Sequence, residues 1–257
     1  MKIINKSVML LKTQKGVIET DQYEKLLKSH DFKVKQVNTL IFKYHDLSEL
    51  NNKLKNCNDY SGILLSSPRC VEAVYLSSGE KQLDSSWRTK LNYTVGEATH
   101  LAALERLGID CRGKESGNAK NLSEIIMKEN TGAVKPFLFP HGNLKTDTLK
   151  IELGRSNIGV EGVLVYDTLA NPNIEEDFRL ATCDFTNFPE YVVFFSPSGV
   201  RSSIELFRRV PDCLEKIKFI AIGPVTETAM KEENIVPEGV AASPNPTEVL
   251  NLLMKKL

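Results

Sequence analysis

The sequence predicts an α/β fold built from two parallel-sheet domains that arose by internal duplication, joined by a two-stranded β linker, with a cleft between them. Three observations predict this: a weak self-similarity with a period of about 128 residues, short apolar runs that each lead into a Ser, Pro or Gly turn and an amphipathic stretch, and a length of 257 residues, which suits two domains. Apolar residues make up 41% of the chain, enough for packed cores.

The duplication rests on three pairs of sequence blocks at nearly equal spacing in the two halves. Small residues that match by chance would rarely keep such spacing. The pairs are ILLSSPR (63–69) with VFFSPSG (193–199), placing Pro68 over Pro197; YTVGEAT (93–99) with IAIGPVT (220–226), placing Gly96 over Gly223 and Thr99 over Thr226; and ESGNAKNLSEII (115–126) with ASPNPTEVLNLL (242–253), placing Asn118 over Asn245.

Each apolar run reads as a strand, and helices fill the gaps. A helix over 99–107 should end at Gly108 and one over 226–233 at Asn234, because both residue types tolerate the left-handed conformation of a helix end. Asn245 should cap a helix that continues with Pro246. The expected strands are 8–11, 32–37, 62–65, 92–95, 137–139, 160–165, 191–195 and 219–222.

The charge balance and the scattered cysteines and histidines exclude several classes of function. Lys and Arg number 33, as do Asp and Glu, so no basic field favours nucleic acid or a membrane surface as a partner. The five cysteines and four histidines show no metal-ligand or disulfide spacing, and we expect no metal. No signal peptide or nucleotide-binding glycine motif is visible, so we expect a cytosolic (cytoplasmic) protein that does not depend on a nucleotide.

The segments TLIFKY (39–44) and VYDTLA (165–170) are β-prone and lie where the chain would cross between the domains, so we interpret them as the linker. Ligands of such folds bind beyond the carboxyl ends of the strands. The turns after the strands are therefore the expected binding positions.

Eight blocks in this order resemble the uroporphyrinogen-III synthase family of the animal type, over about residues 8–253. The blocks are SPR followed by VEA, YTVGEAT, ESGNAKNL, FPHGNLK, VLVYDTLA, FFSPSGVRSS, FIAIGPVTETA and SPNPTEVL. The sequence departs from the family pattern at Asn234, where a glycine is usual, and in 173–190, which shows no match.

The resemblance implies a discontinuous domain of residues 1–37 and 172–257, a second domain of 42–165, and linker segments 38–41 and 166–171. It implies an enzyme that needs no cofactor and closes hydroxymethylbilane into uroporphyrinogen III, inverting ring D and releasing water. We expect a monomer whose partner is this small molecule, with at most a transient contact to the preceding enzyme of the pathway.

The eight carboxylates of that substrate need individually placed donors, and helix N-termini supply backbone N–H groups and partial positive charge. Any one of these turns is equally well explained as an ordinary cap. The predicted binding residues are Ser66, Ser67, Pro68, Arg69, Gly96, His141, Gly142, Asn143, Ser196, Ser198, Gly199, Gly223 and Thr226, with Arg201 as a further candidate for a carboxylate.

Tyr166 is the predicted proton donor to the leaving hydroxyl, because a phenol with a pKa of about 10 stays protonated at neutral pH. Thr99 is the second choice, although a simple cap explains it as well. Asp167 would steady a cation, but its place next to Tyr166 on a strand points it the other way. The alternative function is a non-catalytic binding module for a polyanion, which would need no proton donor.

Overall fold

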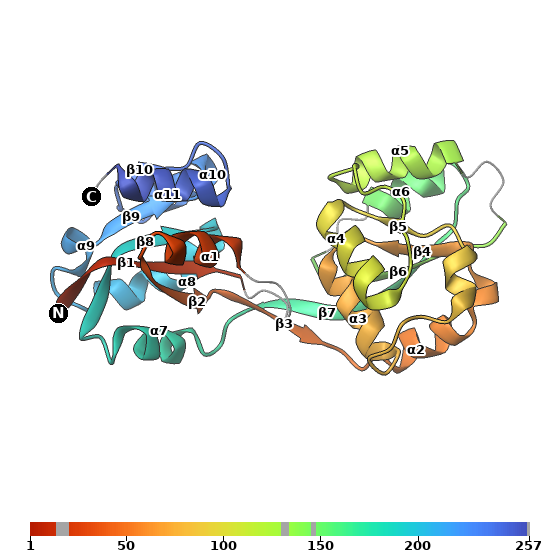
Figure 1. Ribbon diagram of the computed structural model, residues 1–257, viewed down its shortest axis with the longest axis horizontal. Helices are drawn as coiled ribbons and strands as arrows, with labels where there is room; N and C mark the ends of the chain where they lie inside the picture. Colours follow the sequence, from red (N-terminus) through yellow and green to blue (C-terminus); the bar gives the residue numbers. More distant parts are fainter. Residues whose placement is uncertain (14–20, 130–133, 145–147, 256–257) are drawn as a thin grey trace. The chain divides into compact units, whose positions relative to one another are not determined.

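The computed structural model describes residues 1–13, 21–129, 134–144 and 148–255. The chain divides into two compact units (Figure 1): unit 1 is Met1–Ile41 with Leu169–Leu257, and unit 2 is Phe42–Thr168. Unit 2 is therefore one continuous stretch inserted into the sequence of unit 1.

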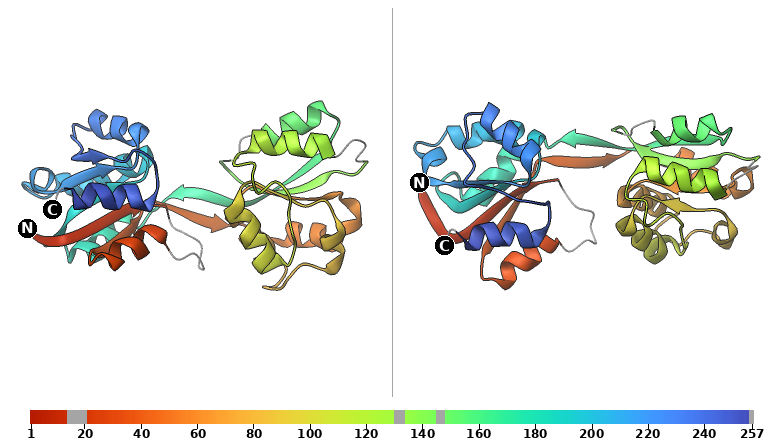
Figure 2. Two further views of the ribbon diagram at one scale, coloured as in Figure 1. Left: turned by 45° about the horizontal axis from the view of Figure 1, so that its top comes forward. Right: turned by 90° about the horizontal axis from the view of Figure 1, so that it is seen from above.

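Unit 1 is a five-stranded parallel sheet in the order β10-β9-β8-β1-β2. Figure 2 shows the sheet with its helices from two further directions. The strands are β1 (Lys2–Lys12), β2 (Lys33–Asn38), β8 (Asn187–Phe194), β9 (Lys218–Ala221) and β10 (Gly239–Val240). The helices are α1 (Gln22–Ser29), α7 (Ile174–Thr182), α8 (Pro197–Arg208), α9 (Cys213–Lys216), α10 (Pro224–Glu232) and α11 (Pro246–Met254).

The core of unit 1 lies on both faces of its sheet. Alternate residues of β1 point to opposite faces: Met9 and Leu11 pack with α7, α8 and α10, whereas Val8 and Leu10 pack with α1 and α11. All four side chains are fully buried. A strand covered on both faces is continuously apolar, which explains the run VMLL in the sequence.

Unit 2 has a five-stranded sheet in the order β3-β7-β6-β4-β5. Helices α2 and α3 cover one face, and α5 and α6 cover the other. The strands are β3 (Leu40–Tyr44), β4 (Gly62–Leu65), β5 (Tyr93–Thr94), β6 (Phe137–Gly142) and β7 (Val160–Ala170). The helices are α2 (Ser48–Lys55), α3 (Pro68–Ser77), α4 (Glu97–Ala102), α5 (Ala119–Glu129) and α6 (Thr148–Arg155), with 3-10 turns at Cys57–Asp59 and Ser85–Thr89 and a π-helix at Ala103–Leu107.

The two sheets share one spatial order of strands, which agrees with the predicted duplication. In unit 1 the order β2-β1-β8-β9-β10 matches β7-β6-β4-β5 in unit 2, followed by an isolated parallel bridge between Tyr93 and Arg112 in place of β10. In chain order unit 1 is the flavodoxin-like 2-1-3-4-5, and unit 2 has the same arrangement in circularly permuted form, because β4 and β5 precede β6 and β7. Ligands of such sheets bind where the direction of winding reverses. That point lies between β1 and β8 in unit 1, and between β6 and β4 in unit 2.

The predicted helix ends and caps are confirmed. Gly108 and Asn234 both have left-handed backbones, with φ of 68° and 59°. Asn118 and Asn245 each accept a hydrogen bond, at 2.9 Å, from the N–H three residues further on. The helix expected from Thr99 begins instead at Glu97 and continues into the π-helix.

The segments predicted as crossings are β3 and the second half of β7. The Asn171 N–H donates to the Thr39 carbonyl at 3.1 Å and the His45 N–H to the Val165 carbonyl at 3.0 Å, so β3 and β7 run in opposite directions. The chain passes from one unit to the other within these strands. The cleft expected between the domains stays a prediction.

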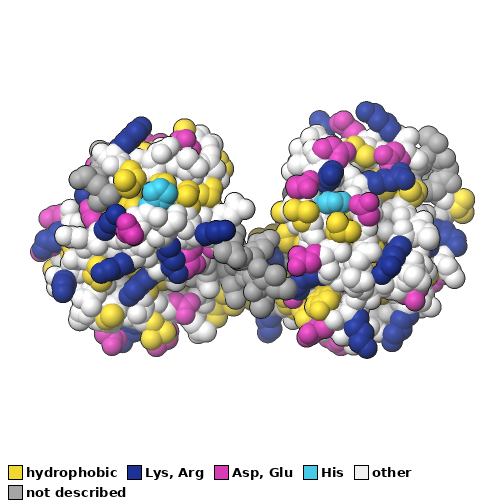
Figure 3. All heavy atoms as spheres, in the orientation of Figure 1, with side chains coloured by type: hydrophobic (Ala, Val, Ile, Leu, Met, Phe, Trp, Pro, Cys, Tyr) yellow, Lys and Arg dark blue, Asp and Glu magenta, His cyan; other side chains and the backbone are white. Residues whose placement is uncertain are grey.

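The surface carries no segregated charge on the face that Figure 3 shows, where basic and acidic side chains are interspersed over each unit. This agrees with their equal numbers in the sequence. Within the described ranges, none of the helices combines the length and the apolar character needed to span a membrane.

Candidate active site

The carboxyl ends of β4 and β6 lie side by side at the reversal point of unit 2. The first part of the candidate site is the turn that follows β4. Ser67 is the N-cap of α3, its backbone is extended, and its Oγ accepts the Cys70 N–H at 3.4 Å. Pro68 occupies the first helical position, where its missing N–H has no cost. Ser66, Ser67, Pro68 and Arg69 are all half-buried and form the turn into α3.

Tyr166 reaches the same place from β7 through an irregularity in the sheet. His141 pairs with Leu164 and Gly142 with Tyr166, so β7 has one extra residue between these pairs. The Tyr166 ring then lies across Gly142, where an added Cβ would come within 2.5 Å of the ring carbons Cε2 and Cζ. The absence of a side chain at Gly142 therefore leaves the space that the Tyr166 ring occupies.

The ring of Tyr166 packs edge-on against two aromatic rings of β3. The ring centroids of Phe42 and Tyr44 lie 5.7 and 6.1 Å from that of Tyr166. The guanidinium of Arg69 stacks on the ring of Phe42, with Cζ 3.6 Å from the ring centroid. These contacts fix the direction of the phenol and place a positive charge in the same cluster.

The hydroxyl of Tyr166 lies 3.4 Å from Ser67 Oγ, and either group can donate the hydrogen bond. Burial raises the pKa of Tyr166 and the neighbouring Cys70 thiol raises it further, while the Ser67 hydrogen bond and the Arg69 charge oppose the increase. The phenol is therefore protonated at neutral pH and available as a donor.

The other predicted residues near β6 and β7 already have partners. The Asn143 side chain accepts the Thr168 N–H at 2.8 Å and donates to the Thr168 carbonyl at 3.4 Å, which ties it to β7. Asp167 Oδ2 lies 3.2 Å from His45 Nε2. His141 is buried, and its Nδ1 lies 3.0 Å from the Gly142 carbonyl oxygen.

The turn between β5 and α4 contains Gly96 and Thr99. Gly96 has φ of 79°, and an added Cβ would meet nothing within 4 Å. Space is therefore open above this turn. Thr99 lies in the first turn of α4 and is only 2% exposed, so little of its hydroxyl is accessible for proton transfer.

Unit 1 repeats the Ser-Pro turn at its own reversal point. Ser196 caps α8 in the same way as Ser67 caps α3: its Oγ accepts the Gly199 N–H at 3.0 Å, and Pro197 is the first helical residue. Ser198 is exposed, and its Oγ lies 3.0 Å from Ser196 Oγ. Gly199 is buried, and a Cβ there would lie 3.4 Å from Thr39 Cγ2.

The turn between β9 and α10 repeats the Gly96 turn. Gly223 has an extended backbone with φ of 176°, and an added Cβ would meet nothing within 4 Å. Thr226 is 3% exposed, like its repeat partner Thr99. Both glycine turns thus leave room for a ligand to approach the backbone, and both threonines face inward.

A buried ion pair at the reversal point of unit 1 was missed in the sequence. Lys12, the last residue of β1, pairs with Asp21, and both side chains are only 7% exposed. The Lys12 ammonium lies 4.7 Å from the Tyr23 ring centroid and 4.8 Å from that of Phe195. Asp21 also caps α1, accepting the Tyr23 N–H at 2.9 Å. The signal was a lysine that directly follows the apolar run VMLL.

In each unit, separately, the structure places the predicted turns at the carboxyl ends of parallel strands. Tyr166, Ser67, Arg69 and Gly142 form one cluster in unit 2, and Thr99 is not part of its hydrogen bonds. No group of three or more His, Cys, Asp or Glu residues is arranged to hold a metal among the described residues.

The fold and this cluster define a class: two-unit α/β proteins with a protonated phenol at the winding reversal of one sheet. A family model described as uroporphyrinogen-III synthase HemD matches residues 21–251. The chain therefore belongs to the uroporphyrinogen-III synthase family, whose members are enzymes of tetrapyrrole synthesis that catalyse the ring-closing step of haem biosynthesis.

Two solved structures share the fold. Uroporphyrinogen-III synthetase from Helicobacter pylori matches with a TM-score of 0.59 and 14% identity, covering 100% of both chains. A mutant uroporphyrinogen III synthase from the extremely thermophilic bacterium Thermus thermophilus matches with a TM-score of 0.54 and 15% identity, covering 97% of this chain and 99% of that one.

Proposed function

We propose that this enzyme is a cofactor-independent lyase that converts hydroxymethylbilane into uroporphyrinogen III, and that Tyr166 is its proton donor. The observation that carries the proposal is the phenol of Tyr166, 3.4 Å from Ser67 Oγ at the start of α3. Family membership over residues 21–251 supplies the reaction.

In the first step, the C–O bond of the hydroxymethyl group on ring A breaks. The pyrrole nitrogen of ring A supplies the electron pair that replaces it, and Tyr166 gives its proton to the departing hydroxide, which leaves as water. A phenol is a stronger acid than water, whose pKa is about 15.7, so this transfer is downhill once the bond is broken. Ser67 and Arg69 lie where they would stabilise the phenolate.

In the later steps, the already substituted α-carbon of ring D attacks the ring A cation and forms a spiro intermediate. In the spiro intermediate the bond from ring D to the bridge carbon of ring C then breaks, with the electron pair returning to ring D and a cation left on ring C. The other α-carbon of ring D attacks this cation, so that ring D is reversed. Ring D then loses the proton at the new bond, which the Tyr166 phenolate recovers. No electrons are gained or lost overall, so the chemistry calls for no redox group.

Each unit has turns that would hold carboxylates of the substrate. Ser67 and Ser196 each cap a helix that begins with proline, and backbone N–H groups of the first turn point away from the helix. The open space above Gly96 and Gly223 would let carboxylates reach these groups. Holding rings A and D together would convert a flexible encounter into a nearly unimolecular closure.

The test is a product analysis. The purified protein is incubated with enzymatically generated hydroxymethylbilane, the products are oxidised, and uroporphyrin isomers I and III are separated by chromatography. Isomer III in excess over the isomer I formed without enzyme is the expected result. Isomer I alone, with tight binding of the bilane, would establish a binding module instead.

A further inference from the structure

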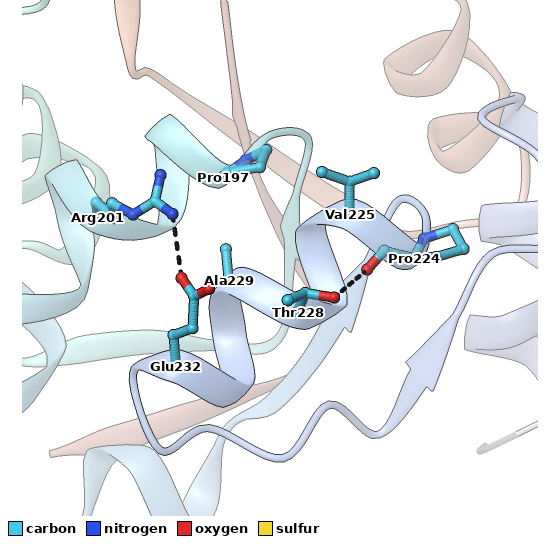
Figure 4. A pocket seen from close by; sticks show the side chains of 7 residues that line it. All are labelled: Pro197, Arg201, Pro224, Val225, Thr228, Ala229 and Glu232. Carbon is cyan, nitrogen blue, oxygen red and sulfur yellow. Dashed lines mark hydrogen bonds and ion pairs between the residues drawn. The ribbon is translucent and has the colours of Figure 1, made fainter.

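A hollow of about 290 Å³ lies between α8 and α10 of unit 1 (Figure 4). Its walls are mainly apolar, formed by Pro197 on α8 and by Pro224, Val225 and Ala229 on α10. Val225 is 72% exposed. Its side chain is therefore accessible to a ligand that enters the hollow.

The two prolines place the hollow at the start of both helices. Pro197 follows the cap Ser196, and Pro224 follows Gly223, so the hollow adjoins the two turns of unit 1 that we propose for substrate carboxylates. A ligand held at those turns therefore has the hollow beside it.

One ion pair closes the far side of the hollow. Nη2 of Arg201 on α8 lies 3.1 Å from Oε2 of Glu232 on α10, and each side chain is 57% exposed. A pair this exposed contributes little to stability, because water solvates both charges nearly as well as they solvate each other. Arg201 can therefore exchange Glu232 for another carboxylate at small cost.

In unit 2 the position that corresponds to Arg201 holds a residue of opposite charge, Glu72, which also forms an ion pair. Glu72 lies four residues after the first proline of α3, just as Arg201 lies four residues after the first proline of α8. Glu72 pairs with Arg106 of the π-helix that follows α4. These side chains are only 19% and 13% exposed, and Arg106 stacks on Tyr75, with Cζ 5.0 Å from the ring centroid. The half-buried pair of unit 2 ties two helices together, whereas the exposed pair of unit 1 leaves a cation at an open hollow.

We propose that this hollow binds one pyrrole ring of the substrate and that Arg201 binds the carboxylate side chain of that ring, displacing Glu232. The proposal rests on the proposed function. A flat ring suits walls of proline and valine, and a guanidinium binds a carboxylate through two parallel hydrogen bonds. The volume is below the roughly 300–1,000 Å³ of pockets that enclose drug-sized ligands, so it suits one ring rather than the whole bilane.

Two substitutions at the pair should have different effects on KM for hydroxymethylbilane. Arg201→Gln removes the carboxylate partner and leaves Glu232 to repel the polyanion, so we expect KM to rise about three- to tenfold. Glu232→Gln removes both the competing partner and the repulsion, so KM should stay at or below the wild-type value. If the ion pair only joined the two helices, Arg201→Gln and Glu232→Gln would change KM equally.

The matched control is Arg208→Gln. Arg208 also joins α8 to the end of α10, through Glu233 at 3.1 Å, but it does not line the hollow. The inference is overturned if Arg201→Gln leaves KM unchanged, if Arg208→Gln raises KM equally, or if Glu232→Gln raises it. The wild-type protein in the same assay tests the proposed function separately, because a failure there appears as absence of isomer III.

Discussion

The ring of Tyr166 lies directly across Gly142, so that a Cβ at Gly142 would come within 2.5 Å of two ring carbons and 2.9 Å of the phenol oxygen. The pair belongs to neighbouring strands, Gly142 ending β6 and Tyr166 lying in β7 after the extra residue. The position of the proposed proton donor therefore depends on the absence of a side chain on the next strand.

Gly142→Ala should displace the phenol without unfolding unit 2. Neither the ring nor the backbone of β6 can give way by an ångström without cost, and a displaced donor loses its alignment with the leaving hydroxyl. We expect kcat to fall by about 10- to 100-fold. The rate of isomer III formation measures this. Gly154→Ala is the control, because a Cβ there meets nothing within 4 Å, and wild-type kcat in both variants would contradict the role of Gly142.

Tyr166→Phe should remove the proton donor and keep the ring. The edge-on contacts with Phe42 and Tyr44 need no hydroxyl, so the fold and KM should change little. General acid catalysis contributes about 10²- to 10⁴-fold, and kcat should fall by that order. Tyr75→Phe, which changes a phenol beside Arg106, is the control. A kcat within twofold of wild type would assign the proton to another group.

The pH dependence of kcat should report the Tyr166 phenol. Its pKa is raised above 10.0, so the protonated donor persists at neutral pH and kcat should fall only above about pH 10. The Ser67 hydrogen bond lowers this pKa, so Ser67→Ala should move the alkaline limb to higher pH. Ser196→Ala loses the equivalent cap in unit 1 and should leave the limb in place. A limb that does not move in Ser67→Ala would rule out this hydrogen bond as its cause.

The turns and caps were predictable because they depend on local sequence. A serine before proline at the end of an apolar run specifies both the strand end and the helix start, and Ser67 and Ser196 follow this rule. Glycine or asparagine after a helix needs only the left-handed backbone, as at Gly108 and Asn234. The repeat then located equivalent turns in the two units.

The contacts within the site were not predictable, because they join residues far apart in sequence. The extra residue of β7 depends on the pairing of β7 with β6, and no local sequence pattern predicts it. Asn143 looked like a donor for substrate, but its amide is tied to Thr168. The surroundings of Lys12, which are Asp21 and the rings of Tyr23 and Phe195, come from other elements of the fold. Helix α7 lies in 173–190, where no repeat or family block guided the assignment.

Removing one charge of the Lys12–Asp21 pair should destabilise unit 1. Lys12→Met keeps the length of the side chain but leaves the Asp21 carboxylate buried without its ammonium partner. Breaking a buried pair in this way costs about 3–5 kcal/mol. Denaturant unfolding measures the loss. Lys216→Met breaks an exposed pair, 54% and 58% exposed, and should change stability by less than about 0.5 kcal/mol. Equal effects would show that the Lys12 pair is no better than a surface contact.

The repeat-related glycines Gly96 and Gly223 should respond differently to alanine. Both leave open space where the Cβ would lie, so in both variants the new methyl group would obstruct a carboxylate approaching the turn and raise KM. Only Gly96 has a φ in the positive range that L residues avoid, at 79° with ψ of 162°, a region essentially restricted to glycine where an L side chain costs about 1–3 kcal/mol. Gly223, at 176°, has a backbone that any residue adopts. We therefore expect Gly96→Ala to lower Tm as well as raise KM, and Gly223→Ala to raise KM at wild-type Tm. Thermal unfolding and initial rates on the same preparations separate the two effects, and an unchanged KM in Gly223→Ala would remove this turn from the proposed substrate contacts.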